Sequence, residues 1–374
     1  MLIIISLIYF ILIIWLIIGF DSLKEFNTGK NNNKTKFSII IPFRNEQDKL
    51  PELIKSLNKI DYPVNCFEIL FIDDDSTDNS VAIILKNIKK ELDYQLLKNI
   101  RETNAPKKDA INLAIKNAKH QWIITTDADC EVPVKWLEVL NGFIKQNQAV
   151  FIAMPVGYKA NDSLLEQFQK IDFMSLMAST IGGFGNKKPI MCNGANLCYL
   201  KSVFKEVNGF KNNQHIASGD DVFLMEKMHQ NFPDKVHYLK SDKVIVYTKP
   251  EKTINGLLQQ RIRWASKSSK TRNNLVKVIG LIVFSINLLM SVFIIYSFSL
   301  YFVNGTINYW FFALFLLKII LDYLLINRCY TFYKEKLKVK YYLFTALLHP
   351  FFMSAIPLLS VFTKYDWKGR RFRV

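Results

Sequence analysis

Pairs and runs of aspartate stand at three places where an apolar segment ends or a helix is expected to begin. Asp127 and Asp129 directly follow the apolar run 121–126. Two carboxylates two residues apart can reach one divalent ion where a strand ends in a turn, and Mg²⁺ is typically held by one or two carboxylates plus substrate phosphates. The pair is a candidate site for Mg²⁺ or Mn²⁺, although an isolated Asp-x-Asp is common by chance.

A second acidic run, DDD at 73–75, follows the apolar segment 67–72. Like charges crowded in this way oppose folding. A solvated turn with a helix N-cap at Ser76 or Thr77 would explain the run structurally. A carboxylate at this place could also accept the imide N–H of uracil, and the run alone does not decide between the two.

The third acidic site is Gly219-Asp220-Asp221, which opens the helical pattern VFLMEKMHQ. Acidic residues in a first turn stabilise the helix dipole, so a purely structural role is one interpretation. A carboxylate at a helix mouth is also a candidate general base for an acceptor hydroxyl. The motif by itself does not choose between these roles.

A fourth motif lies on a basic amphipathic segment, residues 253–273, which has helical periodicity. Gln260 and Arg263 are three residues apart and share one face, and Trp264 lies beside them. Docking of a basic interfacial helix on anionic lipid is the simpler explanation. An arginine aimed at a diphosphate and an aromatic ring under a sugar would instead serve a transferase.

Strand-length apolar runs alternate with amphipathic helical patterns between residues 37 and 250. We expect strands at 37–42, 67–72 and 121–126, and helices at 46–59, 77–92 and 105–119. This alternation predicts an α/β domain with a mostly parallel sheet. Ligands of such sheets bind at the carboxyl ends of the strands, where the first two acidic motifs lie.

Other segments are apolar over lengths that suit a membrane. Residues 2–20 carry no charge and match a hydrocarbon core of roughly 30 Å. With no basic n-region and no small-x-small cleavage site, they predict a retained anchor rather than a signal peptide. Residues 275–303 and 309–326 predict a hairpin, and the segment 341–362 contains two prolines, which favours a re-entrant over a spanning segment.

The charge pattern agrees with a membrane. The 374-residue chain has a formal net charge of +17, and its basic residues cluster beside apolar segments, which favours membrane lipids over nucleic acid. Four lysines follow the first span and mark the cytosolic side, namely Lys24, Lys30, Lys34 and Lys36. The five cysteines include no Cys-x-x-Cys pair, which disfavours a zinc site and indicates a reducing compartment.

Together, in this order and spacing, the motifs resemble those of family-2 glycosyltransferases with a GT-A fold. FSIIIPFRNE at 37–46 resembles the opening strand, FIDDDSTDNS the uridine-binding turn, KKDAINLAI at 107–115 the Gly-Lys-x-x-Ala-x-Asn segment and TTDAD the metal motif. CNGANLCYLKSVFKEVNGF at 192–210 resembles the acceptor-side floor, SGDD the segment with the base, and Gln260-x-x-Arg263-Trp264 the Gln-x-x-Arg-Trp motif of membrane-bound members. The resemblance covers residues 37–265.

This resemblance implies a role for each motif. Asp221 would be the catalytic base with Asp220 beside it, although Asp220 stands where Glu is often found. Asp127 and Asp129 would hold Mg²⁺ or Mn²⁺. Asp75 stands where Gly or Asn is common, which leaves open whether the first or second acid of that run meets the base.

The resemblance also implies the binding residues. Lys108 would keep the diphosphate or base contact, while Lys107 replaces the usual Gly. Gly194 and Asn196 would line the acceptor side. The donor would be bound by Pro42, Arg44, Glu46, Asp73, Asp74, Lys108, Asp127, Gln260, Arg263 and Trp264.

The implied enzyme inverts the anomeric carbon and moves a sugar from a nucleotide sugar, with UDP-sugar favoured, to a hydroxyl of a lipid-linked or lipid-embedded acceptor. Its catalytic domain faces the cytosol, at a bacterial inner membrane. The expected domains are an anchor at 1–22, a GT-A domain at 37–272 with the interfacial helix 253–272, a membrane region at 275–363 with a hairpin at 275–326, and a basic tail at 364–374.

Three alternatives stay open. A processive polysaccharide synthase would share the motifs but builds a channel from more spans than this chain has. A nucleotidyltransferase would also pair aspartates with a metal, but it would usually show a glycine-rich phosphate loop after the first strand, and PFRNEQDKL has no glycine. A transporter would need more spans, because about two hundred residues here form a soluble domain.

Overall fold

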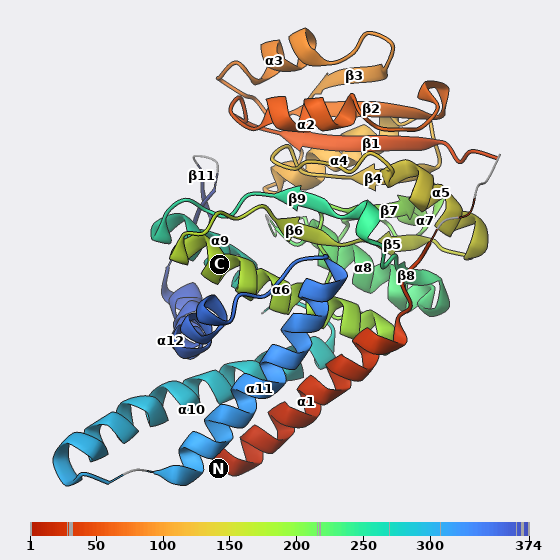
Figure 1. Cartoon of the computed structure of the whole chain (residues 1–374). Helices are drawn as coiled ribbons and strands as arrows, with labels where there is room; N and C mark the ends of the chain where they lie inside the picture. Colours follow the sequence, from red (N-terminus) through yellow and green to blue (C-terminus); the bar gives the residue numbers. More distant parts are fainter. Residues whose placement is uncertain are drawn as a thin grey trace. The chain divides into compact units, whose positions relative to one another are not determined.

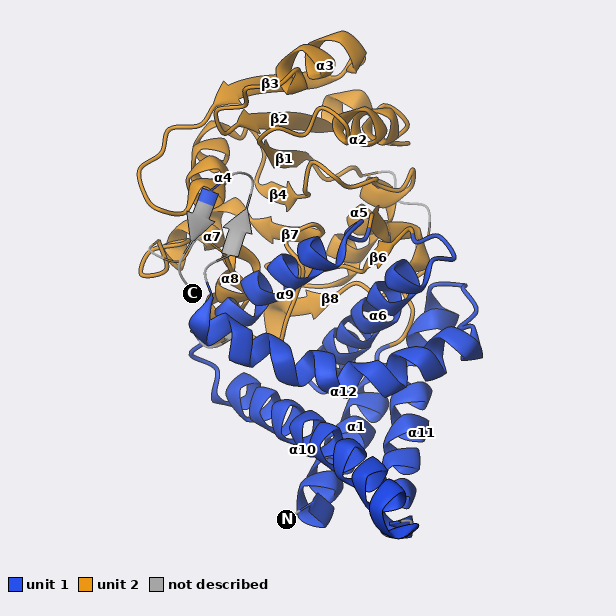
Figure 2. Cartoon of the chain, turned by 90° about the vertical axis from the view of Figure 1, so that its left-hand side faces the viewer, with its two compact units in different colours: residues 1–23, 160–190, 250–374 blue, residues 24–159, 191–249 orange. Residues whose placement is uncertain are grey.

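The computed structural model describes residues 2–27, 29, 33–214, 216, 218–268, 270–306, 308–363, 365–367 and 370–372. The predictions for Lys30 and for much of the basic tail lie outside these residues. The chain divides into two compact units (Figure 2). We call residues 24–159 and 191–249 the sheet unit, and residues 1–23, 160–190 and 250–374 the helical unit.

The sheet unit is built on a seven-stranded sheet with the strand order β3-β2-β1-β4-β7-β5-β8 (Figure 1). Its strands are β1 Phe37–Phe43, β2 Phe67–Asp73, β3 Asp93–Lys98, β4 Trp122–Thr125, β5 Phe151–Ala153, β7 Leu197–Leu200 and β8 Val236–Tyr238. A separate two-stranded sheet pairs β6 Val156–Tyr158 with β9 Val246–Thr248.

The strand directions decide which loops meet. β3, β2, β1 and β4 run parallel, so their carboxyl ends share one edge of the sheet. β7 runs antiparallel to β4 with Thr125 opposite Leu197, which brings the loop before β7 to that same edge. The predicted fold class, a mostly parallel α/β sheet of GT-A type, is confirmed.

Helices and short 3-10 turns connect these strands. They are α2 Leu50–Leu57, α3 Ser80–Asn87, α4 Pro106–Asn117, α5 Trp136–Gln146, α7 Lys201–Glu206 and α8 Asp220–Asn231, with 3-10 turns at Val64–Cys66, Pro233–Lys235 and Asp242–Val244. The first two helices are shorter than predicted at 46–59 and 77–92. Residues 44–49 and 74–79 instead form loops that hydrogen-bond to each other across the strand ends, so tertiary contacts override the helical periodicity.

The helical unit contains α1 Leu2–Ser22, α6 Leu164–Gly185, α9 Ile254–Ser268, α10 Asn274–Asn304, α11 Tyr309–Phe332 and α12 Val339–Phe362, followed by strands β10 Tyr365–Trp367 and β11 Arg370–Phe372. Four of these helices, α1, α10, α11 and α12, are long and apolar enough to cross a membrane by length and composition. In Figure 1, α1, α10 and α11 extend together toward the N-terminus of the chain.

The last apolar helix is unbroken. Pro350 and Pro357 favoured a broken or re-entrant segment, and α12 continues as one helix of 24 residues through both prolines, so the break is wrong while re-entry into the membrane stays a prediction. A proline inside a helix removes one backbone donor and leaves a carbonyl without its usual partner. The hydroxyl of Ser354 donates to the carbonyl of Pro350 at 2.7 Å, one turn after the first proline.

Glycines allow an unusually close approach between α1 and α6. A β-carbon at Gly185 would lie 1.8 Å from the carbonyl oxygen of Gly19, and one at Gly182 would lie 2.4 Å from that of Leu16. Asn186, just beyond α6, donates to the carbonyl of Trp15 at 2.7 Å. The first apolar helix is therefore packed backbone to backbone on α6 and is part of the folded unit.

Gly185→Ala tests this packing. The added methyl group cannot fit without separating the helices, and such overpacking typically costs about 1–3 kcal/mol. We expect a lower thermal midpoint in detergent micelles. Gly280→Ala is the control, because a β-carbon there meets no atom within 4 Å. Equal midpoints for the two variants would contradict the close crossing.

Candidate active site

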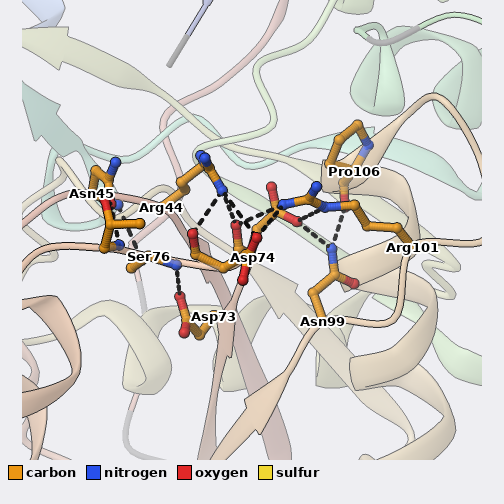
Figure 3. Close-up of polar contacts among 10 residues, drawn as sticks. Arg44, Asn45, Asp73, Asp74, Ser76, Asn99, Arg101 and Pro106 are labelled. Atoms are coloured by element: carbon orange, nitrogen blue, oxygen red, sulfur yellow. Dashed lines mark hydrogen bonds and ion pairs between the residues drawn. The ribbon is translucent and has the colours of Figure 1, made fainter. Parts of the chain in front are cut away.

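Asp74 is the centre of a polar cluster at the ends of β1, β2 and β3 (Figure 3). Its backbone N–H donates to the carbonyl of Phe43, and the residue is 7% exposed. Its Oδ1 accepts hydrogen bonds from Nδ2 of Asn99 at 2.8 Å and from Nε of Arg101 at 3.0 Å. A buried carboxylate needs such partners, and these two hold Asp74 in one orientation.

Arg44 supports the same turn from the loop after β1. Its Nη1 donates to the carbonyl oxygens of Asp74 and Asp75, both at 2.7 Å. Asp75 has a φ of 67°, in the left-handed region that Gly or Asn adopts more readily. The two carbonyl contacts help to hold this turn in a conformation that an aspartate rarely adopts.

Asp73 closes the turn locally. Its Oδ1 accepts from the backbone N–H of Ser76 at 2.9 Å. Helix α3 begins at Ser80, so the alternative of an N-cap at Ser76 or Thr77 is wrong. The run 73–75 therefore forms a hydrogen-bonded turn in which each acid has a different environment.

Glu46 and Pro42 lie beside this turn. Pro42 is buried within β1 opposite Ile72, and Glu46 is 6% exposed. Nζ of Lys49 lies 3.3 Å from Oε2 of Glu46 and 3.8 Å from Oδ2 of Asp129. Lys49 thus connects the loop after β1 to the loop after β4.

Lys107 connects two of the predicted motifs. Its Nζ lies 2.7 Å from Oδ1 of Asp127 and 3.3 Å from Oδ2 of Asp220. Burial by itself would lower the pKa of Lys107, but the charges of Asp127 and Asp220 raise it above its ordinary value. The ammonium group therefore stays charged throughout the physiological pH range.

The lysine that faces the acids is Lys107, whereas Lys108 points elsewhere. Lys108 is 1% exposed, and its Nζ donates to the carbonyls of Asn213 at 2.7 Å and Ile216 at 2.9 Å. Counting the family pattern Lys-x-x-Ala-x-Asn back from Asn112 also begins at Lys107. We therefore predict that Lys107, rather than Lys108, contacts the donor.

The helix-mouth acids lie next to the loop before β7. Oδ2 of Asp221 accepts from the backbone N–H of Gly194 at 3.2 Å, and its Oδ1 accepts from that of Val222 at 2.8 Å. A β-carbon at Gly194 would lie 3.3 Å from Oδ2 of Asp220. Gly219, which precedes the acids, has a φ of 82°, a conformation that glycine adopts readily.

Asn196, the other residue predicted for the acceptor side, is built into the core. It is completely buried, its Oδ1 accepts from the indole of Trp136 at 3.0 Å, and its Nδ2 donates to the carbonyls of Pro155 and Val244. These bonds engage both the oxygen and the nitrogen of the side-chain amide. Its contribution to an acceptor site would therefore be to shape the loop that contains Gly194.

The carboxylates after β4 suit a divalent cation that substrate phosphates help to hold. The side chains of Asp127 and Asp129 are 35% and 37% exposed, and each has a lysine as its neighbour. Among the described residues, no group of three or more His, Cys, Asp or Glu side chains forms a ready metal cage. Two accessible carboxylates fit Mg²⁺ or Mn²⁺, because these ions keep waters and phosphate oxygens as further ligands.

The Gln-x-x-Arg-Trp residues lie on α9 of the helical unit. The ring centroid of Trp264 is 4.2 Å from the guanidinium carbon of Arg261, and Oε1 of Gln260 accepts from the same guanidinium at 2.5 Å. Arg263 is half-buried. Two of the three motif residues therefore contact an arginine that the sequence analysis did not single out.

Other residues of the site were also missed. Asn99 and Arg101 follow β3, and no strand was predicted there because DYQLLK is charged at both ends and contains no long apolar run. The rule that ligands gather at the carboxyl ends of parallel strands would have found both residues once that strand was recognised.

The mostly parallel sheet, with acidic loops at its strand ends, has the GT-A architecture. Residues 38–207 match the family model "Glycosyl transferase family 2". The match covers less than half of the chain, and over these residues the chain is similar to the glycosyltransferases of family 2. This match favours a glycosyltransferase over the nucleotidyltransferase alternative.

Curated relatives agree with this match. The chain is 26% identical over 237 residues to the poly-β-1,6-N-acetyl-D-glucosamine synthase of Staphylococcus epidermidis, covering 61% of this chain and 53% of the relative. It is 30% identical over 133 residues to the undecaprenyl-phosphate 4-deoxy-4-formamido-L-arabinose transferase of Salmonella choleraesuis, covering 35% and 40%. The chain thus spans about half the length of the curated relatives it matches, or less.

A structural neighbour shares the fold. The mannosyltransferase PcManGT from Pyrobaculum calidifontis, solved in complex with GDP-Man and Mn²⁺, has a TM-score of 0.57 and 15% identity. The match covers 93% of this chain and 94% of that chain. At this identity the likeness shows the fold alone.

Replacing Lys107 by Met tests whether its ammonium occupies a cation position at Asp127. Removing the ammonium leaves the carboxylate charge for a divalent ion, so Mn²⁺ should bind roughly tenfold more tightly, a change of about 1.4 kcal/mol. Asp129→Ala should weaken binding instead. The measurement is Mn²⁺ titration followed by electron paramagnetic resonance without nucleotide.

The matched control is Lys116→Met on the same helix, where the lysine is exposed and 3.7 Å from Glu102. Its Mn²⁺ affinity should equal that of the wild type. An unchanged affinity in Lys107→Met would show that the lysine does not compete with a metal.

Proposed function

We propose that the protein is an inverting, metal-dependent glycosyltransferase that moves a sugar from a nucleotide sugar, with UDP-sugar favoured, to a hydroxyl of a lipid-linked or lipid-embedded acceptor. One observation carries this proposal. Lys107 joins Asp127 to Asp220, so the predicted metal residues and the helix-mouth acids belong to one cluster at the strand ends. Groups for the leaving diphosphate and for the acceptor would then act on the same sugar.

On the donor side, Asp127 and Asp129 would hold the divalent cation, which would offset the charge that develops on the leaving diphosphate. Lys107, already beside Asp127, is placed to contact the same phosphates. Asp73 and Asp74 form the turn that would take the uracil base. Arg263 of α9 would add a cation to the leaving group.

On the acceptor side, the hydroxyl oxygen would attack the anomeric carbon as its proton passes to a carboxylate of the enzyme. The new glycosidic C–O bond forms while the bond from that carbon to the diphosphate oxygen breaks. The nucleoside diphosphate leaves with the bonding electrons. A single displacement of this kind inverts the configuration, and fixed alignment of the reactants supplies part of the rate.

Asp221 is the better candidate for the proton acceptor. Two backbone N–H groups hold its carboxylate in one orientation beside Gly194. The carboxylate of Asp220 is instead paired with the Lys107 ammonium, whose Nζ lies 3.3 Å from its Oδ2. Asp220 would therefore keep Lys107 in place while its neighbour accepts the proton.

The acceptor is proposed from the chemistry of the base and from the apolar helices. Four helices suit a membrane, so an acceptor within or attached to lipid would reach the enzyme there. One relative is named for an undecaprenyl-phosphate acceptor. A phosphate is already ionised and needs no base, so the buried acids at the helix mouth favour a hydroxyl instead.

A processive polysaccharide synthase is the second candidate. The match to a relative named as a poly-β-1,6-N-acetyl-D-glucosamine synthase covers 61% of this chain, and it includes residues beyond the acidic loops. The two candidates differ in product length. Mass spectrometry of products made from a UDP-sugar would show a single added residue for a simple transferase and a ladder for a synthase.

We further propose that the sheet unit faces the cytosol, at a bacterial inner membrane. Lys24, Lys34 and Lys36 follow α1 and would mark that side. Cysteines introduced at exposed positions of the sheet unit should react with a membrane-impermeant maleimide only after the cells are lysed. Labelling in intact cells would reverse the orientation.

Asp221→Asn tests the base. Asn keeps the shape of the side chain, and UDP binding with Mn²⁺ should be nearly unchanged because the base acts on the acceptor. Single-turnover transfer should fall about 10²–10⁴-fold, the usual contribution of general-base catalysis. Asp220→Asn should reduce the rate less, because Asp220 acts through Lys107.

The outcome separates the two acids. Near-normal transfer by Asp221→Asn would remove that residue from the chemical step. A larger defect in Asp220→Asn than in Asp221→Asn would mean that the proton goes to the first acid.

A further inference from the structure

A buried group of charged side chains joins three helices of the helical unit. Asp172 of α6 and Arg261 of α9 are 3% and 6% exposed. Oδ2 of Asp172 accepts from Nε of Arg261 at 2.9 Å and lies 2.6 Å from its Nη2. Nε2 of His349 on α12 lies 3.2 Å from Oδ1 of Asp172. We call these three residues the Asp172 network, and the proposed chemistry uses none of them.

The arginine of this network is also the residue that the motif contacts. Its Nη1 donates to Oε1 of Gln260 at 2.5 Å, and its guanidinium stacks on the ring of Trp264 at 4.2 Å from the centroid. A guanidinium is planar, so a carboxylate along one edge fixes the plane against which an aromatic ring packs. Gln260 and Trp264 therefore take their orientation from the arginine that Asp172 holds.

A second contact from α6 fixes the start of α9. Gln169 lies one turn before Asp172 on the same face of α6. Its Nε2 donates to the carbonyl of Glu251, and its Oε1 accepts from the backbone N–H of Glu251, both at 2.9 Å. α9 is thus held at the residues before its first turn and again at its middle, so rotation about its axis would break both contacts.

The Asp172 network is better explained by the arrangement of helices that it enforces than by a contribution to folding stability. Burial raises the pKa of Asp172, but Arg261 and His349 together lower it to about 2, so the carboxylate is charged at physiological pH. Desolvation offsets much of the attraction in a buried ion pair, and replacing both partners by apolar residues is often neutral. Such pairs are best explained by the single arrangement that they enforce.

We propose that Asp172, supported by His349, is a positioning residue for the Gln-x-x-Arg-Trp motif. Through Arg261 it fixes Gln260 and Trp264, and through His349 it ties the motif helix to the apolar helix α12. The inference rests on the proposed function, in which the motif contacts the donor during transfer. The inference adds that the apolar helix α12 and the motif on α9 move together.

Asp172→Asn is the first test. UDP binding with Mn²⁺ should persist and weaken less than transfer does, because the acids of the sheet unit would still hold the base and the metal while only the contacts from the motif are disturbed. The kcat for transfer should fall on the order of 10²-fold, the effect that a misplacement of about 1 Å can have. Asp162→Asn is the control, because Asp162 forms an exposed ion pair with Lys338 in the same unit. Normal transfer by Asp172→Asn would overturn the proposal.

The double variant Asp172→Asn, Arg261→Met separates positioning from stability. If the single variant is unstable because it leaves the arginine charge buried, removing that charge should restore the thermal midpoint. Transfer should stay low, since Gln260 and Trp264 have lost the side chain that orients them. Recovery of both the midpoint and transfer would show that the pair serves stability alone and would refute positioning.

A readout without catalysis keeps this inference distinct from the proposed function. Hydrogen exchange of residues 254–268 in detergent should increase in Asp172→Asn and in His349→Gln, and stay at the wild-type level in Asp162→Asn. Unchanged exchange in both network variants would refute the tie to α6 and α12. Arg263→Ala tests the motif itself: if it transfers sugar normally, the donor role fails even where the exchange result holds.

Discussion

The acidic loops of the sheet unit can share one edge of the sheet only because basic side chains stand between them. Two like charges about 4 Å apart repel by roughly 4 kcal/mol near a protein surface. Arg44 and Arg101 hold the turn at 73–75, and Lys107 stands between Asp127 and Asp220. Parallel strands bring the acids together. These cations offset the repulsion between the carboxylates, so the chain can fold before any substrate is present.

The sequence predicted the strands that matter for this arrangement, because their apolar runs are continuous and end at acidic residues. It placed the start of α4 within one residue but began α2 and α3 too early. Periodicity placed a helix from residue 46, but the backbone N–H of Glu46 donates to the hydroxyl of Ser80, thirty-four residues away, and α2 begins at Leu50. Contacts of that range are not visible in a local pattern, and they decide where a loop gives way to a helix.

The site shows the same division. The aspartates were found because acidic runs after apolar strands are unusual, and Arg44 was found through the family resemblance. The partners Asn99 and Arg101 were not found, and Lys107 was given no contact. Lys107 and Lys108 are chemically identical neighbours about 100° apart around α4. Only the packed structure shows that one reaches Asp127 while the other lies among the carbonyls near Asn213. Asp172 and Arg261 are equally ordinary in sequence and meet across eighty-nine positions.

Lys107 and Arg261 are cations that suit different tasks. Lys107 is a point charge on a flexible stem with two carboxylates as partners, so it can exchange one of them for a phosphate or leave room for a metal without losing the other. Arg261 is a planar group fixed by a carboxylate on one edge and a ring on its face, and any movement breaks both contacts. A lysine therefore stands where the proposed reaction must rearrange charge, and an arginine where the motif helix must keep its place.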